Sequence, residues 1–405
     1  MRILQVNKFF YRRGGSETYF FELADLLKKN GHEVIHFSTK AGANLASPND
    51  EFFIEEINFG KREGLVRDLK KFGHSLYSFE AKKKLEKLII ATKPDIAHLH
   101  NISHHISPSI FSVFKKYKIP VVQTLHDYQL ICPNFKLFTE GAVCERCKKY
   151  RYWNAVFHRC VHDSRFQSLA EAKEMFFHRA CQFYEKGVKC FVTPSKFLAG
   201  KLAAWQVKSK VENTPLFLDA SRFLPKYEPG DYVIYFGRLA KEKGIDILFR
   251  ALADTDIKLK IVGDGQESEK LKVKSEKLKV NVEFVEHKSG KELHDLIRDS
   301  KFVVLPSIWY ENYPMSLLEA GALGKAAVAS SLGGIPEIIY DGENGFLAAP
   351  NDVNDFREKI QRLFGDNDLC EKMGRRAREM ILENNSPEDH YKKIMKVYET
   401  LTTND

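Results

Sequence analysis

The chain has 405 residues, of which 43% are hydrophobic and 29% charged, with 24 Gly and 14 Pro. These fractions are typical of a globular protein and exclude a disordered, collagen-like or coiled-coil chain, while the length favours two domains over one. No apolar run approaches the ~20 residues that span a bilayer, and the first apolar run is too short for a signal peptide. The sequence therefore predicts a soluble, cytoplasmic protein.

The net charge of +9 is concentrated in the first half of the chain. Residues 61–93 contain ten Lys or Arg and four acidic residues. Residues 129–162 contain six Lys or Arg and two acidic residues. A local basic surface of this kind predicts an anionic membrane surface or an acidic acceptor as a partner of this half. A lysine-rich helix face that contacts only solvent explains the same charges, so both interpretations stay open.

Short β-branched runs alternate with helical patterns through the first half. Strands are predicted at 3–6, 33–37, 95–100, 120–126 and 188–194. Helices are predicted over 17–30 and 65–92, and the insertion 129–162, rich in Cys and aromatic residues, fits neither period. This alternation predicts a parallel sheet with right-handed crossovers and helices on both faces.

A second series of the same kind follows the loop 224–231. Its predicted strands are 232–237, 257–263, 282–286, 302–306 and 326–330. Helices are predicted after Gly244, after Gly265, around 289–299, around 315–323, near 367–383 and from Ser386 onward. The predicted fold class is α/β, with two doubly wound parallel-sheet domains that meet near 223–231.

Ligands of open parallel sheets bind beyond the carboxyl ends of the strands, so motifs that follow a strand are candidate site residues. The first, Gly14-Gly15-Ser16-Glu17, opens a helix. Its glycines let the backbone approach a phosphate, and the helix amides attract that phosphate. A tight turn that binds nothing explains the two glycines equally well.

The segment from Gly237 to Gly244 follows the first strand of the second series and carries two well-placed cations. Arg238 is suited to bind a diphosphate with its guanidinium fork, and Lys243 with a point charge. Charged residues are also common on loops that bind no ligand. The turn Gly263-Asp264-Gly265 follows the next strand and is a weaker signal of the same kind.

The segment from Glu311 to Glu319 is the most informative. Pro314 fits the first position of a helix, so Glu311 lies in the loop before it and Glu319 more than one turn inside it. The two carboxylates are placed to bind different parts of one ligand, while free amides near Ser316 and Leu317 face an anion. An ordinary acidic helix start is the alternative.

The motifs occur in one order along the chain, namely GGSE, His126-Asp127 after a strand, GRLAKEKG, VGDG, E-x7-E, EAGALGKAAVAS and GGIPEII. Together they resemble the family 4 retaining glycosyltransferases of the GT-B fold. The resemblance covers nearly the whole chain, including TPSKFL at 193–198. One departure is Lys325-Ala326-Ala327-Val328, which stands where the family has a Pro-Val pair.

The resemblance implies two Rossmann-like domains that face each other across a cleft. Residues 1–223 would bind the acceptor, residues 224–385 a nucleotide-diphosphate sugar, and the helix in 386–405 would pack back on the first domain. The catalytic residues implied are His126, Arg238, Lys243 and Glu311. The donor-binding residues implied are Gly14, Gly15, Gly237, Gly263, Asp264, Gly265, Glu286, Asn312, Pro314, Met315, Ser316, Leu317 and Glu319.

The resemblance also implies what each side chain does. Arg238 and Lys243 would neutralise the diphosphate as it departs, and Glu319 would accept hydrogen bonds from the ribose hydroxyls. Glu311 would bind hydroxyls of the transferred sugar, and His126 would lie near the anomeric centre, unless it is a histidine packed at a strand end. No divalent metal or other cofactor is implied for catalysis.

The implied reaction is retaining transfer of a sugar to a glycan or lipid-linked hydroxyl, in cell-surface polysaccharide synthesis at the inner face of the cell membrane. A GT-B epimerase or phosphorylase is the alternative within the same fold. A zinc-ribbon-like module that binds nucleic acid is the least favoured alternative, because the donor motifs are intact, and nucleic acid is not expected as a partner.

Four of the seven cysteines, Cys132, Cys144, Cys147 and Cys160, lie in the insertion 129–162. Four thiolates are sufficient for a structural zinc ion, and His158 and His162 are rival ligands. Reduced thiols without a metal, or a redox pair, are the alternatives. The insertion is expected to form a lip over the acceptor site.

Overall fold

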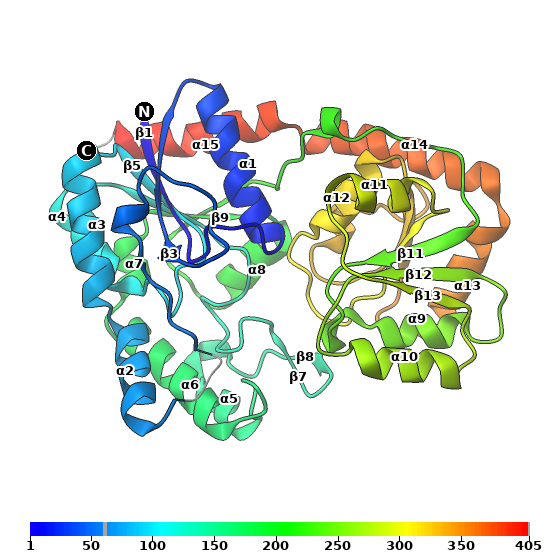
Figure 1. Cartoon of the computed structure of the whole chain (residues 1–405), viewed down its shortest axis with the longest axis horizontal. Coiled ribbons are helices and arrows are strands. Elements are labelled where there is room, and N and C mark those ends of the chain that lie inside the picture. The colour runs from blue at the N-terminus through cyan, green and yellow to red at the C-terminus, as the bar shows by residue number, and fades with distance from the viewer. Residues whose placement is uncertain (60–62, 404–405) are drawn as a thin grey trace. The chain divides into compact units, whose positions relative to one another are not determined.

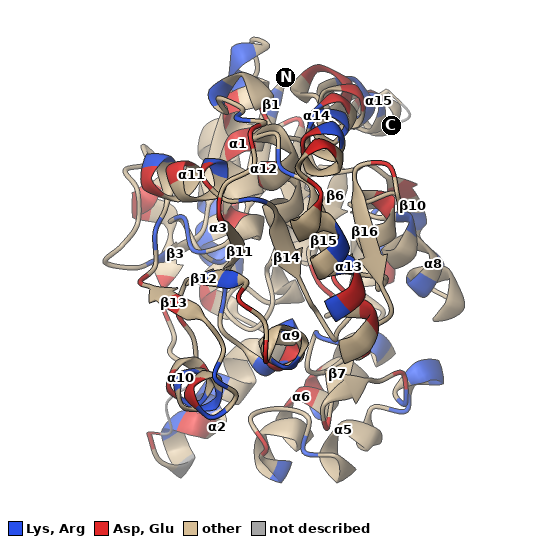
Figure 2. Ribbon diagram, turned by 90° about the vertical axis from the view of Figure 1, so that its right-hand side faces the viewer, with Lys and Arg blue, Asp and Glu red and all other residues tan. Residues whose placement is uncertain are grey.

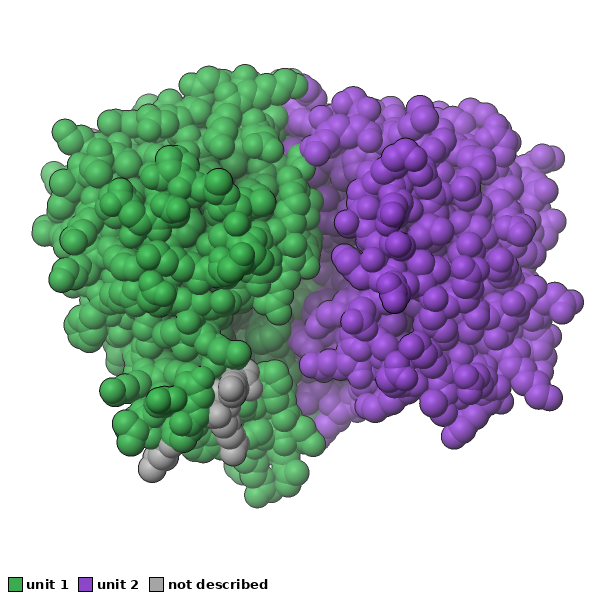
Figure 3. Space-filling model, in the orientation of Figure 1, with its two compact units in different colours: residues 1–135, 145–214, 390–405 green, residues 136–144, 215–389 purple. Residues whose placement is uncertain are grey.

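The computed structural model describes residues 1–59 and 63–403, apart from the side chain of Leu65. It consists of two compact units, coloured separately in Figure 3. Unit 1 comprises residues 1–135, 145–214 and 390–405, and unit 2 comprises residues 136–144 and 215–389. Lys61 and Arg62 of the predicted basic stretch, and positions 404–405 of the predicted closing segment, lie outside the described residues.

Unit 1 is built on a six-stranded parallel sheet in the order β10-β9-β6-β5-β1-β2. The strands are β1 (Arg2–Val6), β2 (Glu33–Phe37), β5 (Ile96–Leu99), β6 (Val121–Thr124), β9 (Cys190–Thr193) and β10 (Lys210–Asn213). Every residue of β5, β6 and β9 is buried, as expected for strands covered by helices on both faces. Two short parallel strands, β3 (Thr39–Lys40) and β4 (Ile54–Glu55), pair apart from this sheet.

The helices of unit 1 connect these strands (Figure 1). They are α1 (Gly15–Lys29), α2 (Leu65–Leu76), α3 (Phe79–Thr92), α4 (Phe111–Lys116), α5 (Trp153–Phe157), α6 (Arg165–Ala180), α7 (Phe183–Gly187) and α8 (Lys196–Ala204). The prediction of one helix over 65–92 is wrong, because Tyr77 is extended and Ser78 begins a new helix. The Ser78 hydroxyl accepts a hydrogen bond from the Ala81 amide and so caps α3.

Unit 2 has the same architecture, with six parallel strands in the order β13-β12-β11-β14-β15-β16. The strands are β11 (Tyr232–Phe236), β12 (Lys258–Val262), β13 (Val282–Val285), β14 (Val303–Leu305), β15 (Ala327–Ser330) and β16 (Gly345–Ala348). The helices are α9 (Ile245–Leu252), α10 (Ser268–Lys277), α11 (Gly290–Arg298), α12 (Met315–Ala322), α13 (Val353–Gly365) and α14 (Asn367–Asn384). In Figure 1, α9 and α10 lie on one side of the sheet and α11 and α12 on the other.

The units divide after Thr214, nine positions before the expected boundary at 223. The reason is that residues 215–223 bind α14 of unit 2. The Leu218 amide donates to the Asn385 carbonyl over 3.0 Å, and Arg378 donates to the carbonyls of Ala220 and Phe223. The linker therefore belongs to the second unit.

The final helix, α15 (Pro387–Thr402), belongs to unit 1 from His390 onward. Its Tyr398 hydroxyl lies 2.5 Å from Nδ1 of His98 in β5, and Nε2 of His390 lies 3.0 Å from the Tyr19 hydroxyl. Both contacts are buried. The end of the chain thus completes the core of the first unit.

The insertion is divided between the two units, whereas the sequence placed all of 129–162 in the first domain. A hairpin of β7 (Phe138–Thr139) and β8 (Ala142–Val143) lies in the segment 136–144, which belongs to unit 2. The Lys136 ammonium holds it there by an ion pair with Glu242. Among the described helices of both units, none combines the length and the apolar composition needed to cross a bilayer.

Candidate active site

The loops that follow β11, β12 and β14 are joined at the carboxyl edge of the unit 2 sheet. The Leu239 amide donates to the Asp264 carbonyl over 2.9 Å, and the Ile308 amide donates to the Glu242 carbonyl over 2.9 Å. Since ligands of open parallel sheets bind at this edge, these loops form the candidate site of unit 2. The sequence placed most of its donor-binding residues here.

Two glycines of these loops allow the backbones to approach closely. Gly263 has φ of +140°, and a Cβ atom there would lie 2.1 Å from the Gly237 carbonyl oxygen. Gly244 has φ of +66°, and a Cβ atom there would lie 2.0 Å from the Pro306 carbonyl oxygen. The contact between loops already requires glycine at both positions, whatever contact they make with a donor.

Lys243 and Glu311, which the sequence assigned to the same ligand, form an ion pair. The Lys243 ammonium lies 2.6 Å from Oε1 of Glu311, which also accepts a hydrogen bond from the Ser307 hydroxyl over 2.6 Å. Burial opposes the charge on Glu311, but Lys243 and Ser307 lower its pKa below the ordinary value. Glu311 is therefore an ionised acceptor held in one orientation.

Arg238 binds a different carboxylate. Its Nη2 lies 2.5 Å from Oε1 of Glu242, whose side chain is 5% exposed, while 54% of the Arg238 side chain remains exposed. The sequence did not identify Glu242 as a site residue. The sequence did contain a signal for this pair. Glu242 is the single acidic residue among the cations of GRLAKEKG, so it is the natural counterion of one of them.

Glu319 lies on α12 and has a different environment. Burial raises the pKa of its carboxyl to about 7, and no ion pair or side-chain hydrogen bond to it is found within residues 1–59 and 63–403. Helix α12 begins at Met315 with Pro314 as its N-cap, one position later than expected. The Leu317 amide donates to the Pro314 carbonyl over 3.1 Å, so the expectation that this amide is free for an anion is wrong.

The other predicted donor-binding residues of unit 2 vary in environment. Oδ1 of Asp264 accepts hydrogen bonds from the Gly265 amide and the Ser268 hydroxyl, so this carboxylate holds the turn before α10. Asn312 is buried, Met315 and Ser316 are half-buried, and Glu286 is exposed after β13. In the described part of the chain, no ion pair links Glu286 or Glu319 to Lys243 or Arg238.

His126, Gly14 and Gly15 belong to unit 1. Gly14 is the N-cap of α1, and Gly15 is its first residue. Nε2 of His126 lies 3.0 Å from Nδ1 of His100, and the two rings stack. Burial lowers the pKa of His126 to about 3, so its imidazole is neutral near pH 7.

His126 lines a small cavity at the carboxyl edge of the unit 1 sheet. The cavity, of about 30 Å³, is also lined by His100, Asp127, Gln129 and Tyr184. His98 lies in β5 and His100 follows the strand, and their rings stack on the same face. The sequence analysis did not identify them, although their alternation in DIAHLH was a visible signal. A row of neutral histidines therefore leads from α15 to this cavity.

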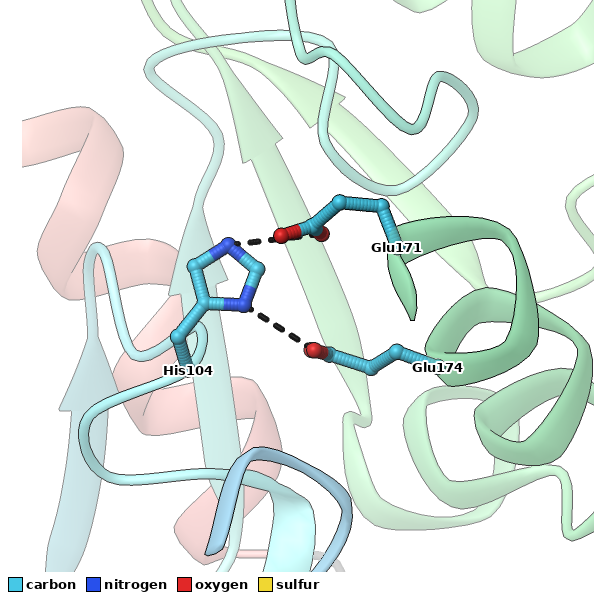
Figure 4. Close-up of side chains that lie close together, drawn as sticks. All are labelled: His104, Glu171 and Glu174. Atoms are coloured by element: carbon cyan, nitrogen blue, oxygen red, sulfur yellow. Dashed lines mark hydrogen bonds and ion pairs between the residues drawn. The ribbon is translucent and has the colours of Figure 1, made fainter. Parts of the chain in front are cut away.

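A second polar cluster lies in unit 1, on α6 and the loop after β5 (Figure 4). Nδ1 of His104 is 3.0 Å from Glu174, and Nε2 is 3.6 Å from Glu171. Burial opposes the charge on His104, but the two glutamates raise its pKa to about 9. His104 is thus an imidazolium that joins the loop to α6, and the sequence did not predict this cluster.

This cluster also bears on the expected zinc site. Among the described residues, the set of three potential ligands whose atoms lie within 4.8 Å of one another is His104, Glu171 and Glu174, rather than the cysteines. All seven cysteines lie in the described residues, and none of them forms a disulfide there. Cys147 packs with Tyr152 in a small core that Cys160 borders. The structural zinc at Cys132, Cys144, Cys147 and Cys160 stays a prediction.

Two family models match this chain over consecutive ranges. The model described as Glycosyltransferase Family 4 matches residues 13–222, and the model described as Glycosyl transferases group 1 matches residues 219–380. N-acetyl-alpha-D-glucosaminyl L-malate synthase of Bacillus anthracis is 24% identical over 96% of this chain and 93% of its own. The two family models meet at residues 219–222, a few positions after the division of the units at Thr214.

Solved structures share the fold. Sucrose-phosphate synthase from Thermosynechococcus elongatus has a TM-score of 0.72 at 18% identity, with both chains fully covered. HepE of Anabaena, solved with UDP and glucose, has a TM-score of 0.69 at 16% identity and covers 99% of this chain and 100% of its own. The two parallel-sheet units are those of the GT-B fold, and the chain belongs to Glycosyltransferase Family 4 and is a glycosyltransferase.

Proposed function

We propose that the chain transfers a sugar from a nucleotide-diphosphate sugar to an acceptor hydroxyl with retention of the anomeric configuration. The observation that carries the proposal is the charge arrangement at the edge of the unit 2 sheet. Arg238 presents an exposed guanidinium there, and Lys243 holds the ionised Glu311. The solved complex of HepE with UDP and glucose supports a nucleotide-sugar donor in this fold.

In the proposed reaction, the bond between the anomeric carbon and the diphosphate oxygen breaks, and its electron pair stays on that oxygen. The acceptor oxygen forms the new bond to the same carbon on the same face. The acceptor proton passes to the departing phosphate oxygen, so no protein base is consumed. Arg238 and Lys243 stabilise the charge that develops on the diphosphate, which replaces a divalent metal in this proposal.

Glu319 is proposed to bind the ribose of the donor. Its carboxyl is desolvated and accepts no side-chain hydrogen bond within residues 1–59 and 63–403. Two vicinal hydroxyls would satisfy such a carboxylate and lower its pKa. Glu311, oriented by Lys243 and Ser307, is proposed to bind hydroxyls of the transferred sugar.

Unit 1 is proposed to bind the acceptor at the carboxyl edge of its sheet, with one acceptor hydroxyl at the small cavity lined by His126 and Asp127. A neutral imidazole can both donate and accept one hydrogen bond, which suits a sugar hydroxyl. The resemblance implies that His126 lies near the anomeric centre of the transferred sugar, and we propose that it also binds the acceptor hydroxyl there. A glycan or lipid-linked sugar fits this chemistry, as in the synthesis of a cell-surface polysaccharide.

An anionic membrane is the proposed surface on which unit 1 meets a lipid-linked acceptor. Val66 and Leu69, at adjacent positions on one face of α2, are 69% and 67% exposed, and Trp153, Phe157 and Phe166 are exposed on α5 and α6. Exposed apolar side chains beside Lys and Arg are typical of an interfacial surface. In unit 2, acidic and basic residues are instead interspersed along α10 and α13 (Figure 2).

A panel of UDP-, GDP-, ADP- and TDP-sugars tests the proposal in a thermal-shift assay, since a bound donor raises the melting temperature. We expect one base to stabilise the wild type, Glu319→Ala to remove the shift, and the exposed Glu269→Ala to retain it. Release of nucleoside diphosphate only when an acceptor is present supports transfer over epimerisation. No shift with any donor, or an unchanged shift in Glu319→Ala, would overturn the site.

A further inference from the structure

The hairpin segment 136–144 contributes a cation to the loop that carries Arg238. The Lys136 ammonium lies 2.9 Å from Oε1 of Glu242, the oxygen that Nη2 of Arg238 approaches to 2.5 Å. All three residues belong to unit 2. One buried carboxylate oxygen is thus shared between a lysine of the insertion and the arginine that the sequence assigned to the diphosphate.

The turn of the hairpin lies near the same loop. At Gly141, in the turn between β7 and β8, a Cβ atom would lie 3.7 Å from the Lys241 ammonium. The Glu242 carbonyl accepts the Ile308 amide, so the loop is also fixed to the segment after β14. The position of the carboxylate between Lys136 and Arg238 is therefore set by the backbone.

The charge of this group decides how strongly Arg238 attracts an anion. Glu242 is buried, and its charge has to be compensated at that place. With Lys136 present, the three side chains carry a net charge of +1, and 54% of the Arg238 side chain remains exposed. Without Lys136, Arg238 would be the one cation within residues 1–59 and 63–403 that is ion-paired with the buried carboxylate, and a diphosphate would compete with Glu242 for it.

We propose that Lys136 is a positioning residue for the donor site: by sharing Glu242 with Arg238, it weakens the competition of that carboxylate with a diphosphate for the Arg238 guanidinium. The inference rests on the proposed function, because it takes the diphosphate as the ligand of Arg238. It gives the Cys-rich insertion a part in donor binding, in addition to the lip over the acceptor that the sequence suggested.

Inorganic pyrophosphate is the probe for this inference, because it lacks the base and the sugar that are still unidentified. Its affinity is measured by titration calorimetry on the full chain. We expect Lys136→Met to weaken pyrophosphate binding about tenfold, a size usual for residues of one ion-pair network, and Lys136→Arg to retain it. Lys270→Met, which removes an exposed lysine from α10, is the matched control and should bind as the wild type does.

The double variant Lys136→Met/Glu242→Gln distinguishes positioning from direct contact. Removing the carboxylate charge abolishes the competition for Arg238, so the double variant should regain most of the lost affinity. If Lys136 touched the phosphate, or only anchored the hairpin, the double variant would bind pyrophosphate more weakly than Glu242→Gln alone, and the inference would be wrong. Melting temperatures identify any variant whose loss comes from misfolding.

Arg238→Ala separates this inference from the proposed function. If Arg238→Ala binds pyrophosphate as the wild type does, the assignment of the diphosphate to Arg238 fails. If Arg238→Ala is weak while Lys136→Met is unchanged, the proposed function stands and only the role of Lys136 is overturned.

Discussion

The Lys243 ammonium and the Glu311 carboxylate, 68 positions apart in the chain, lie 2.6 Å from each other in the interior of unit 2. The pair joins the loop after β11 to the segment between β14 and α12. Glu311 is buried and Lys243 is half-buried, so Lys243 is the main compensation for the buried Glu311 charge. Lys243, which the resemblance assigns to catalysis, thus also stabilises the folded structure of the site.

Lys243→Met should therefore lower both stability and activity. It leaves the Glu311 carboxylate buried without its counterion, and we expect a loss of about 3–5 kcal/mol in the free energy of unfolding. The double variant Lys243→Met/Glu311→Gln should recover most of this stability but remain inactive. Denaturant melts and donor turnover measure the two effects. A double variant that regained turnover would show that Lys243 acts only through Glu311.

The pH dependence of donor binding should report Glu319, whose pKa burial raises to about 7. Hydroxyl donors bind the ionised form, so donor affinity should increase as the pH rises from 6 to 8. In Glu319→Gln this increase should be absent. Donor dissociation constants at several pH values, measured by calorimetry, test this prediction, and a wild-type affinity that falls over this range contradicts it.

The same carboxyl should affect the stability of the protein without ligand, with a defined sign. Because its folded-state pKa is above the ordinary value of 4.5, the folded state binds more protons between pH 4.5 and about 7, and stability is lost as the pH rises through this window. The contribution is about 3 kcal/mol at most. Glu319→Gln should melt above the wild type at pH 8, and this difference should shrink or vanish near pH 4.5.

The attachment of α15 to unit 1 should depend on Tyr398. Tyr398→Phe leaves the buried Nδ1 of His98 without its partner at 2.5 Å, and we expect a loss of about 1–3 kcal/mol. Tyr391 lies on the same helix, and its hydroxyl is hydrogen-bonded to His32 at a less buried place. Tyr391→Phe is therefore the control, and its loss in the free energy of unfolding should be smaller. Thermal melts of both variants compare the two sites, and equal losses would contradict the assignment of α15 to the core.

Anionic vesicles test the proposed membrane surface. Val66→Ser/Leu69→Ser should weaken vesicle binding, since it removes apolar area from the exposed face of α2, and the exposed Val273→Ser in α10 should not. Replacing Lys82–Lys84 by glutamine, or adding salt, should weaken binding as well. Cosedimentation with vesicles of anionic and of neutral lipid measures this, and binding unaffected by charge and salt would count against the surface.

Most of the sheet strands were predictable because their residues are buried on both faces. Nearly continuous apolar runs mark β1, β5, β9 and β11 in the sequence to within two residues of their observed bounds. The elements that were not predicted include β10, β16, α13 and the short strands β3, β4, β7 and β8. Strand β10 lies at a sheet edge and is only partly buried, so its sequence, Lys-Val-Glu-Asn, has no apolar run.

The sequence by itself determined the two series of strands and helices, the order of the motifs and hence the family, because these depend on local periodicity and on residues close together in the chain. Only the tertiary structure decided which charges meet. The pairing of Glu242 with both Arg238 and Lys136 joins segments about a hundred positions apart. Such contacts follow from how strands are ordered in a sheet, and the energy of a buried charge depends on every group folded around it, which no local pattern records.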